Sequence, residues 1–134
     1  MRTWSADSTA PPEAAWPLLA RPSAWPSWAP HLRGAWGLGA PEVREGATGF
    51  ARLVGVVPVP ARIVRKRAGR SWTWRVAPGL VEMDHRVEPR AGGGSRVVIE
   101  LRAPAPLEAA LAAAYGPVIQ ATLGRLARVA AAGR

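Results

Sequence analysis

Two side chains of this sequence could take part in proton transfer. His85 occupies an apolar position of an alternating segment, and imidazole is the side chain whose unperturbed pKa lies nearest neutrality. It could protonate or orient a ligand oxygen, with the phenol of Tyr115 as a hydrogen-bond donor. The alternative is that His85 is a buried structural residue, hydrogen-bonded for example by Tyr115. The sequence leaves both interpretations open and establishes no catalytic group.

Other reactive arrangements are absent from the sequence. Because it contains no cysteine, disulfides, thiolate zinc sites and cysteine nucleophiles are excluded. We expect a capping or surface role for His31, and neither histidine belongs to a metal-binding motif. Asp84 adjoins His85, but neighbouring strand residues point to opposite faces and cannot form a catalytic pair. There is no complete glycine fingerprint for a dinucleotide, so we expect neither metal nor cofactor.

The basic residues are unevenly distributed along the chain. It has 18 Lys and Arg against 9 Asp and Glu, a net charge of +9, and no acid lies between Glu45 and Glu82. A basic patch in that interval would attract nucleic acid such as RNA, an anionic membrane or an acidic protein assembly. A solvated hairpin tip is the alternative, and a compositional bias toward arginine explains the charge without any partner. The patch comprises Arg62, Arg65, Lys66, Arg67, Arg70 and Arg75.

Alternation along this segment predicts which of the basic side chains face inward. Arg65 and Arg67 share the parity of Ile63, so we expect them to point toward the apolar side of the strand. There they would attract an anionic or carboxylated ligand. Arg62 and Lys66 have the opposite parity and are expected to face outward.

Hydrophobic periodicity predicts the elements that position these residues. A short strand over 3–8 precedes two short helices within 9–30, and further strands are expected near 35–38, 49–57, 59–67, 71–76, 80–88 and 96–103. The turns between the later strands are too short for crossover helices, so the sheet is antiparallel. One face is apolar and needs a cover. The segment 107–132, apolar at spacings of three and four, predicts a long helix that supplies it.

Several local motifs occur in the same order as in a known superfamily. They are PEAAW at 12–16, WPSWAP at 25–30, GRSWTW at 69–74, DHRVEP at 84–89 and GGSRV at 93–97. On these motifs the chain resembles the START-like SRPBCC superfamily, specifically its polyketide cyclase/dehydrase-like branch. The resemblance implies an α+β helix-grip fold. A curved antiparallel sheet of about seven strands would wrap on the long C-terminal helix, with two short helices after the first strand, and residues 1–134 would form a single domain.

The resemblance also implies an elongated apolar cavity between the sheet and the long helix. Such a cavity would bind a small hydrophobic ligand that is polyketide-, lipid- or quinone-like, with cyclase or dehydrase activity as a further alternative. A core filled by the same side chains is the competing interpretation. The expected lining residues are Trp25, Trp28, Ile63, Trp72, Trp74, Met83, His85, Ile99, Tyr115 and Ile119.

The sequence also bears on the compartment. The first ten residues lack the apolar core of a secretory signal, and no uninterrupted apolar run reaches the roughly 18 residues of a transmembrane helix. We therefore expect a cytoplasmic protein without a transmembrane segment. Its oligomeric state stays open.

Overall fold

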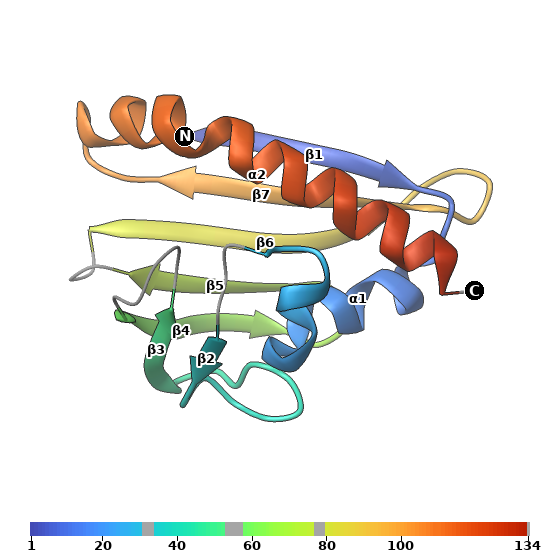
Figure 1. Ribbon diagram of the computed structural model, residues 1–134, viewed down its shortest axis with the longest axis horizontal. Helices are drawn as coiled ribbons and strands as arrows, with labels where there is room; N and C mark the ends of the chain where they lie inside the picture. Colours follow the sequence, from blue (N-terminus) through green and yellow to red (C-terminus); the bar gives the residue numbers. More distant parts are fainter. Residues whose placement is uncertain (31–33, 53–57, 77–79, 134) are drawn as a thin grey trace.

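The computed structural model describes residues 1–30, 34–52, 58–76 and 80–133 (Figure 1). The predicted role of His31 falls outside these residues. Three elements open the chain: strand β1 (Arg2–Ser8), helix α1 (Pro12–Ala20) and the short 3₁₀ helix η1 (Pro22–Ser27). Strands β2 (Gly34–Trp36), β3 (Thr48–Arg52), β4 (Pro58–Arg67), β5 (Ser71–Val76), β6 (Val81–Pro89) and β7 (Ser95–Arg102) follow, and helix α2 (Leu107–Ala132) ends the fold.

The strands form one seven-stranded antiparallel sheet in the order β1-β7-β6-β5-β4-β3-β2. From β2 to β7 each strand pairs with the next one along the chain. Only β1 pairs out of sequence, at the edge formed by β7. The predicted α+β architecture, with two short helices after the first strand, is confirmed.

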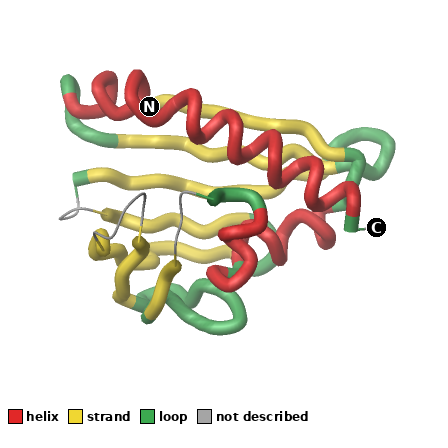
Figure 2. The backbone as a smooth tube through the Cα atoms, viewed as in Figure 1, coloured by secondary structure: helices red, strands yellow, loops and turns green. Residues whose placement is uncertain are grey.

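The helices lie on one side of the sheet and cover its apolar face (Figure 2). Helix α2 packs mainly on β1, β7 and α1, while η1 contacts β2 at the other end. In β5 and β6 the buried positions Trp72, Trp74 and His85 alternate with Arg75 and Asp84 on the opposite face. Alternation of this kind gives the sheet an inner face that faces the helices and an outer face that carries the charges.

A bulge in β4 reverses the predicted orientation of three basic side chains, whereas Arg62, which precedes the bulge, faces outward as predicted. The register with β5 shifts between Ile63 and Arg65: Ile63 pairs with Trp74 of the inner face, whereas Arg65 pairs with Thr73 of the outer face. The extra residue inverts the parity of everything after it. Arg65 and Arg67 therefore lie on the outer face, and Lys66 lies in register with Trp72 on the inner face, opposite to prediction.

The first half of α2 is oriented differently from prediction. Tyr115 is 52% exposed, whereas its neighbour Gly116 is buried. A Cβ on Gly116 would lie 3.2 Å from the Trp4 indole of β1, so the bare backbone of the helix accommodates that ring. Successive helical residues point about 100° apart, which turns Tyr115 away toward solvent. Tyr115 is therefore excluded from the interior that it was expected to line.

Candidate functional site

An aromatic cluster occupies the inner face where β5, β6 and η1 meet. The Trp72 ring stacks on His85 with 3.8 Å between centroids and on Trp25 with 5.4 Å. Trp74 stands edge-on to all three rings, at 5.3 Å from Trp72, 5.5 Å from His85 and 5.6 Å from Trp25. Stacked and edge-to-face contacts at these separations are favourable arrangements of aromatic rings. The cluster is therefore well packed.

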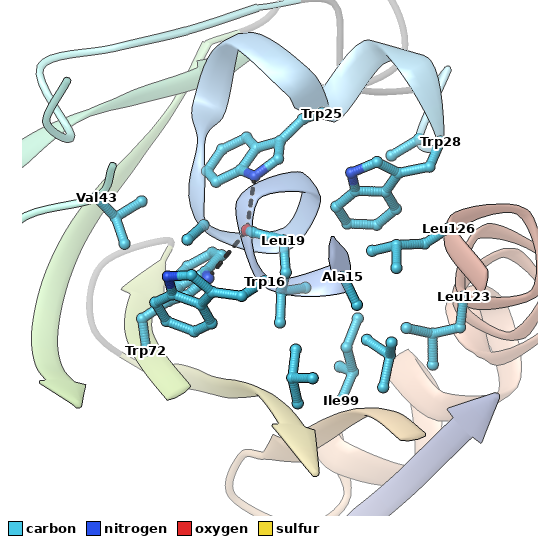
Figure 3. Close-up of a cluster of buried hydrophobic side chains, with 14 of the residues drawn as sticks. Ala15, Trp16, Leu19, Trp25, Trp28, Val43, Trp72, Ile99, Leu123 and Leu126 are labelled. Carbon is cyan, nitrogen blue, oxygen red and sulfur yellow. Dashed lines mark hydrogen bonds between the residues drawn. The ribbon is translucent and has the colours of Figure 1, made fainter. Parts of the chain in front are cut away.

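The indole N–H groups of this region differ in whether they have a hydrogen-bond acceptor. Trp25 and Trp72 both donate to the carbonyl oxygen of Leu19, at 2.9 and 3.0 Å (Figure 3). Trp28 donates to the Leu18 carbonyl at 2.8 Å. The Nε1 of Trp74 is buried without a hydrogen-bond partner among the described residues. Because an unpaired buried donor costs about 1–3 kcal/mol, this N–H is a place where an acceptor would be bound favourably.

His85 is held in one tautomer by the backbone. Its Nδ1 lies 3.3 Å from the carbonyl oxygen of Trp72, and since a carbonyl can only accept, Nδ1 carries the proton. Burial lowers the pKa of His85 from 6.5 to about 4, against smaller opposing effects of Asp84 and of the Trp72 and Met83 backbone. The ring is therefore neutral at pH 7, and its Nε2 is a hydrogen-bond acceptor.

The predicted lining residues gather in the interior with one exception. Met83 is partly buried against the core and Tyr115 lies outside it. The buried members are Trp25, Trp28, Ile63, Trp72, Trp74, His85, Ile99 and Ile119. The prediction that Asp84 and His85 point apart is confirmed, because Asp84 accepts a 2.7 Å hydrogen bond from Thr73, which lies opposite it on the outer face.

Two interior contacts were not predicted by the sequence patterns. Glu42, in the loop before β3, accepts the Trp16 indole N–H at 3.1 Å and forms a 3.1 Å ion pair with Lys66. Trp4 of β1 packs against Gly116. No spacing rule links a loop glutamate to a lysine 24 positions later, or a strand tryptophan to a glycine of the last helix.

Half of the predicted basic patch is neutralised. Glu82 binds Arg65 at 3.1 Å and Arg75 at 3.2 Å, and Lys66 is paired with Glu42. Burial raises the pKa of Glu82, but the two arginines outweigh it and hold that pKa below its usual value. The other three members, Arg62, Arg67 and Arg70, form no ion pair with any described residue.

Two hollows among the described residues are lined mostly by outer-face residues and not by the aromatic cluster. The larger, of about 830 Å³, lies over β3 and β4, between Phe50 and Arg62. The smaller, of about 330 Å³, lies over β5 to β7 among paired charges that include Asp84 and Arg86. Of the predicted lining residues only Ile63 borders either hollow. Neither hollow borders the aromatic cluster.

The interior offers few groups that could bind a metal or the polar part of a ligand. Across the part of the chain that the structure describes, no three potential metal ligands come together. No helix among those residues has the length and apolarity needed to cross a membrane. The groups that a ligand would meet beside the aromatic cluster are the Trp74 donor and the neutral His85 ring.

A curved antiparallel sheet that wraps on a long C-terminal helix defines the helix-grip, START-like class of proteins. Within that class, the family model described as "Polyketide cyclase / dehydrase and lipid transport" matches residues 3–131, and the chain belongs to this family. A comparison with curated proteins finds no match.

Solved structures of low sequence identity share the fold. A protein from Nitrosomonas europaea is 12% identical with a TM-score of 0.77, covering 99% of this chain and 95% of the other. A protein from Thermobifida fusca is 20% identical with a TM-score of 0.76, covering 97% and 93%. A polyketide cyclase-like protein from Corynebacterium glutamicum is 16% identical with a TM-score of 0.63, covering 96% and 89%. At such identities the likeness shows the fold alone.

Proposed function

We propose that the protein binds a small hydrophobic molecule that carries a hydroxyl or carbonyl oxygen, on the inner face of the sheet beside Trp74 and His85. The observation that carries the proposal is the buried indole N–H of Trp74, which has no acceptor among the described residues. Four other tryptophans, including Trp25 and Trp72, donate to acceptors within the protein. Membership of a family described by cyclisation, dehydration and lipid transport supports a hydrophobic ligand.

The chemistry of the two groups specifies the polar part of the ligand. Trp74 offers a donor and the neutral His85 ring offers an acceptor at Nε2, and the two rings are edge-to-face neighbours 5.5 Å apart. A hydroxyl group can accept from one and donate to the other, whereas a carbonyl can satisfy only Trp74. An aromatic alcohol would also extend the stack of rings. Hydroxylated aromatic compounds are therefore the favoured ligands.

The pKa of His85 supports binding rather than acid catalysis. With a pKa of about 4 the ring is almost never in its charged imidazolium form at neutral pH, while an effective general acid has a pKa near the working pH. Tyr115, the other candidate, is 52% exposed on α2. The cyclase or dehydrase alternative would thus require His85 to change its environment on ligand binding.

Calorimetric titration with 1-naphthol and with naphthalene tests the proposal. The wild-type protein should prefer 1-naphthol, because only that compound has an oxygen for Trp74. Trp74→Phe should lower the affinity for 1-naphthol roughly fivefold, the equivalent of about one neutral hydrogen bond, and leave naphthalene binding nearly unchanged. The preference would then largely disappear.

Trp16→Phe is the matched control for this substitution. Trp16 is 6% exposed and Trp74 is 7% exposed, but the Trp16 indole has an internal acceptor in Glu42. Its replacement should reduce stability by about 1 kcal/mol and retain the preference for 1-naphthol. The proposal fails if neither compound binds, or if both variants keep the wild-type preference.

A further inference from the structure

A stacked aromatic pair lies exposed on the outer face, away from the helices. Trp36 of β2 and Phe50 of β3 are cross-strand partners with ring centroids 5.5 Å apart and an angle of 28° between their planes. Their exposed fractions are 46% and 40%, although every other described tryptophan is buried or half-buried. Two large stacked rings that are exposed to water form a surface on which another planar ring can stack.

Positive charge surrounds this aromatic pair. The guanidinium of Arg52 lies 5.5 Å from the Trp36 ring centroid, a cation–π separation. Phe50 also borders the hollow of about 830 Å³, in which Arg62 and Arg75 lie. This volume falls within the range of about 300–1,000 Å³ usual for ligand pockets.

The side chains that line the hollow have a formal charge of +1, from Arg62 and Arg75 against Glu45. Arg75 is paired with Glu82 outside it, and the only acidic lining residue is Glu45, which accepts the backbone N–H of Lys66. Neither Arg52 nor Arg62 has an ion-pair partner among the described residues. Two unpaired guanidinium groups beside an aromatic stack are complementary to an anionic ligand that also carries planar rings.

We infer that the outer face of β2, β3 and β4 binds single-stranded nucleic acid. A base stacks on the Trp36–Phe50 pair, and Arg52 and Arg62 bind the phosphates on either side of it. This combination of aromatic platform and basic groove is how proteins bind single strands without reading sequence. Of the predicted hairpin patch this site uses Arg62, whereas Arg65, Lys66 and Arg75 are already paired with acids.

Two other polyanions fit this surface less well. The bases of a duplex are already stacked on one another, so they cannot lie on the aromatic pair. An anionic membrane would bury the pair in lipid, but Arg52, Arg62 and Glu45 border the rings and the hollow, and burying these charges in an apolar medium is costly. Binding of a duplex and binding of an anionic membrane are therefore measured as alternative outcomes in the test.

The test measures fluorescence anisotropy of a labelled single-stranded oligoribonucleotide of mixed sequence at low salt. Trp36→Ala should weaken binding about 5- to 150-fold, the range for one base stacked on an aromatic side chain, and Trp36→Phe should restore much of it. Arg52→Gln with Arg62→Gln should reduce the slope of log affinity against log salt concentration by about 1.4, or about 0.7 for each phosphate contact. Circular dichroism verifies that each variant is folded.

Arg125→Glu on α2 is the control for total charge, because Arg125 is exposed and forms no ion pair with any described residue. It should weaken binding much less than Arg62→Glu. The inference is overturned if the oligonucleotide does not bind, or if Trp36→Ala binds as well as wild type. It is also overturned if Arg125→Glu and Arg62→Glu have equal effects, or if a duplex of the same sequence or phosphatidylserine vesicles bind more tightly than the single strand.

Discussion

His85 and Trp74 are edge-to-face neighbours with opposite unused hydrogen-bonding capacity. Trp74 has a donor without an acceptor among the described residues, and His85 uses Nδ1 on the Trp72 carbonyl and keeps Nε2 unprotonated. Burial among aromatic rings forces this state on the imidazole, since a charged ring there would lose its hydration. At the residue scale, Trp74 and His85 can therefore hydrogen-bond a polar atom of a ligand, but His85 is a poor proton donor at neutral pH.

The depressed pKa of His85 makes stability dependent on pH. The unfolded chain binds a proton on this ring below about pH 6.5, whereas the folded protein binds it only near pH 4. The free energy of unfolding should therefore fall as the pH is lowered through this window, by about 3 kcal/mol in total. Urea unfolding at several pH values, in a His31→Gln background that removes the other histidine, measures the slope.

His85→Gln is the comparison for that experiment. It removes the titrating ring, so the slope between pH 6.5 and pH 5 should nearly vanish, whatever the change in absolute stability. The carboxylates of Asp7, Glu82 and Glu108 have lowered pKa values and act mainly below this range. An unchanged slope in His85→Gln would contradict the assignment of a neutral buried ring.

At the element scale, the pairing of β2 with β3 depends on close backbone contact between glycines. A Cβ on Gly49 would overlap the carbonyl oxygen of Trp36 and lie 2.9 Å from the backbone of Gly37. Gly37 itself has φ = 82°, a conformation that residues with side chains rarely adopt. These glycines allow β2 to close the edge of the sheet and to hold Trp36 against Phe50.

Gly49→Ala should separate β2 from β3 and disrupt the aromatic pair. The steric overlap involves backbone atoms, so no flexible side chain can relieve it, and a cost of about 1–3 kcal/mol is expected. Hydrogen exchange should show loss of protection confined to β2 and β3. Gly69→Ala is a useful contrast: nothing lies within 4 Å of its added Cβ, so its cost comes from φ = 76° alone. Widespread loss of protection in Gly49→Ala would refute this localisation.

The whole molecule is held together by the second half of α2. Leu123 and Leu126 have no exposed surface and join the core in which Leu19, Trp25 and Ile99 also lie (Figure 3). The first half packs through Gly116 and exposes Tyr115. The helix therefore fastens the sheet at one end and contributes much less burial at the other.

Leu123→Ala should cost about 2–5 kcal/mol, because it leaves a cavity between α2 and the sheet. Val118→Ala, on the same helix at 38% exposure, should change stability by no more than about 0.5 kcal/mol. Chemical denaturation of both variants measures the difference. Similar costs for the two substitutions would mean that the two halves of α2 contribute equally to the core.

Much of this fold and part of the site could be predicted from local patterns. Alternation identified the inner positions Trp72, Trp74 and His85, and the three-and-four spacing identified α2 over Leu107–Ala132. Both signals come from geometry that a segment carries by itself. The same rule failed after Ile63, because a bulge changes the parity without leaving a mark in the sequence.

By itself, then, the sequence determined the order of the elements, the antiparallel sheet and the apolar face that the helices cover. Only the tertiary structure decided that Tyr115 faces solvent, that Lys66 turns inward to Glu42 and that Trp74 alone among the buried indoles lacks an acceptor in the described residues. The physical reason is the range of the interactions. Periodicity is a property of one segment, whereas burial and hydrogen-bond partners depend on segments that are distant in the chain.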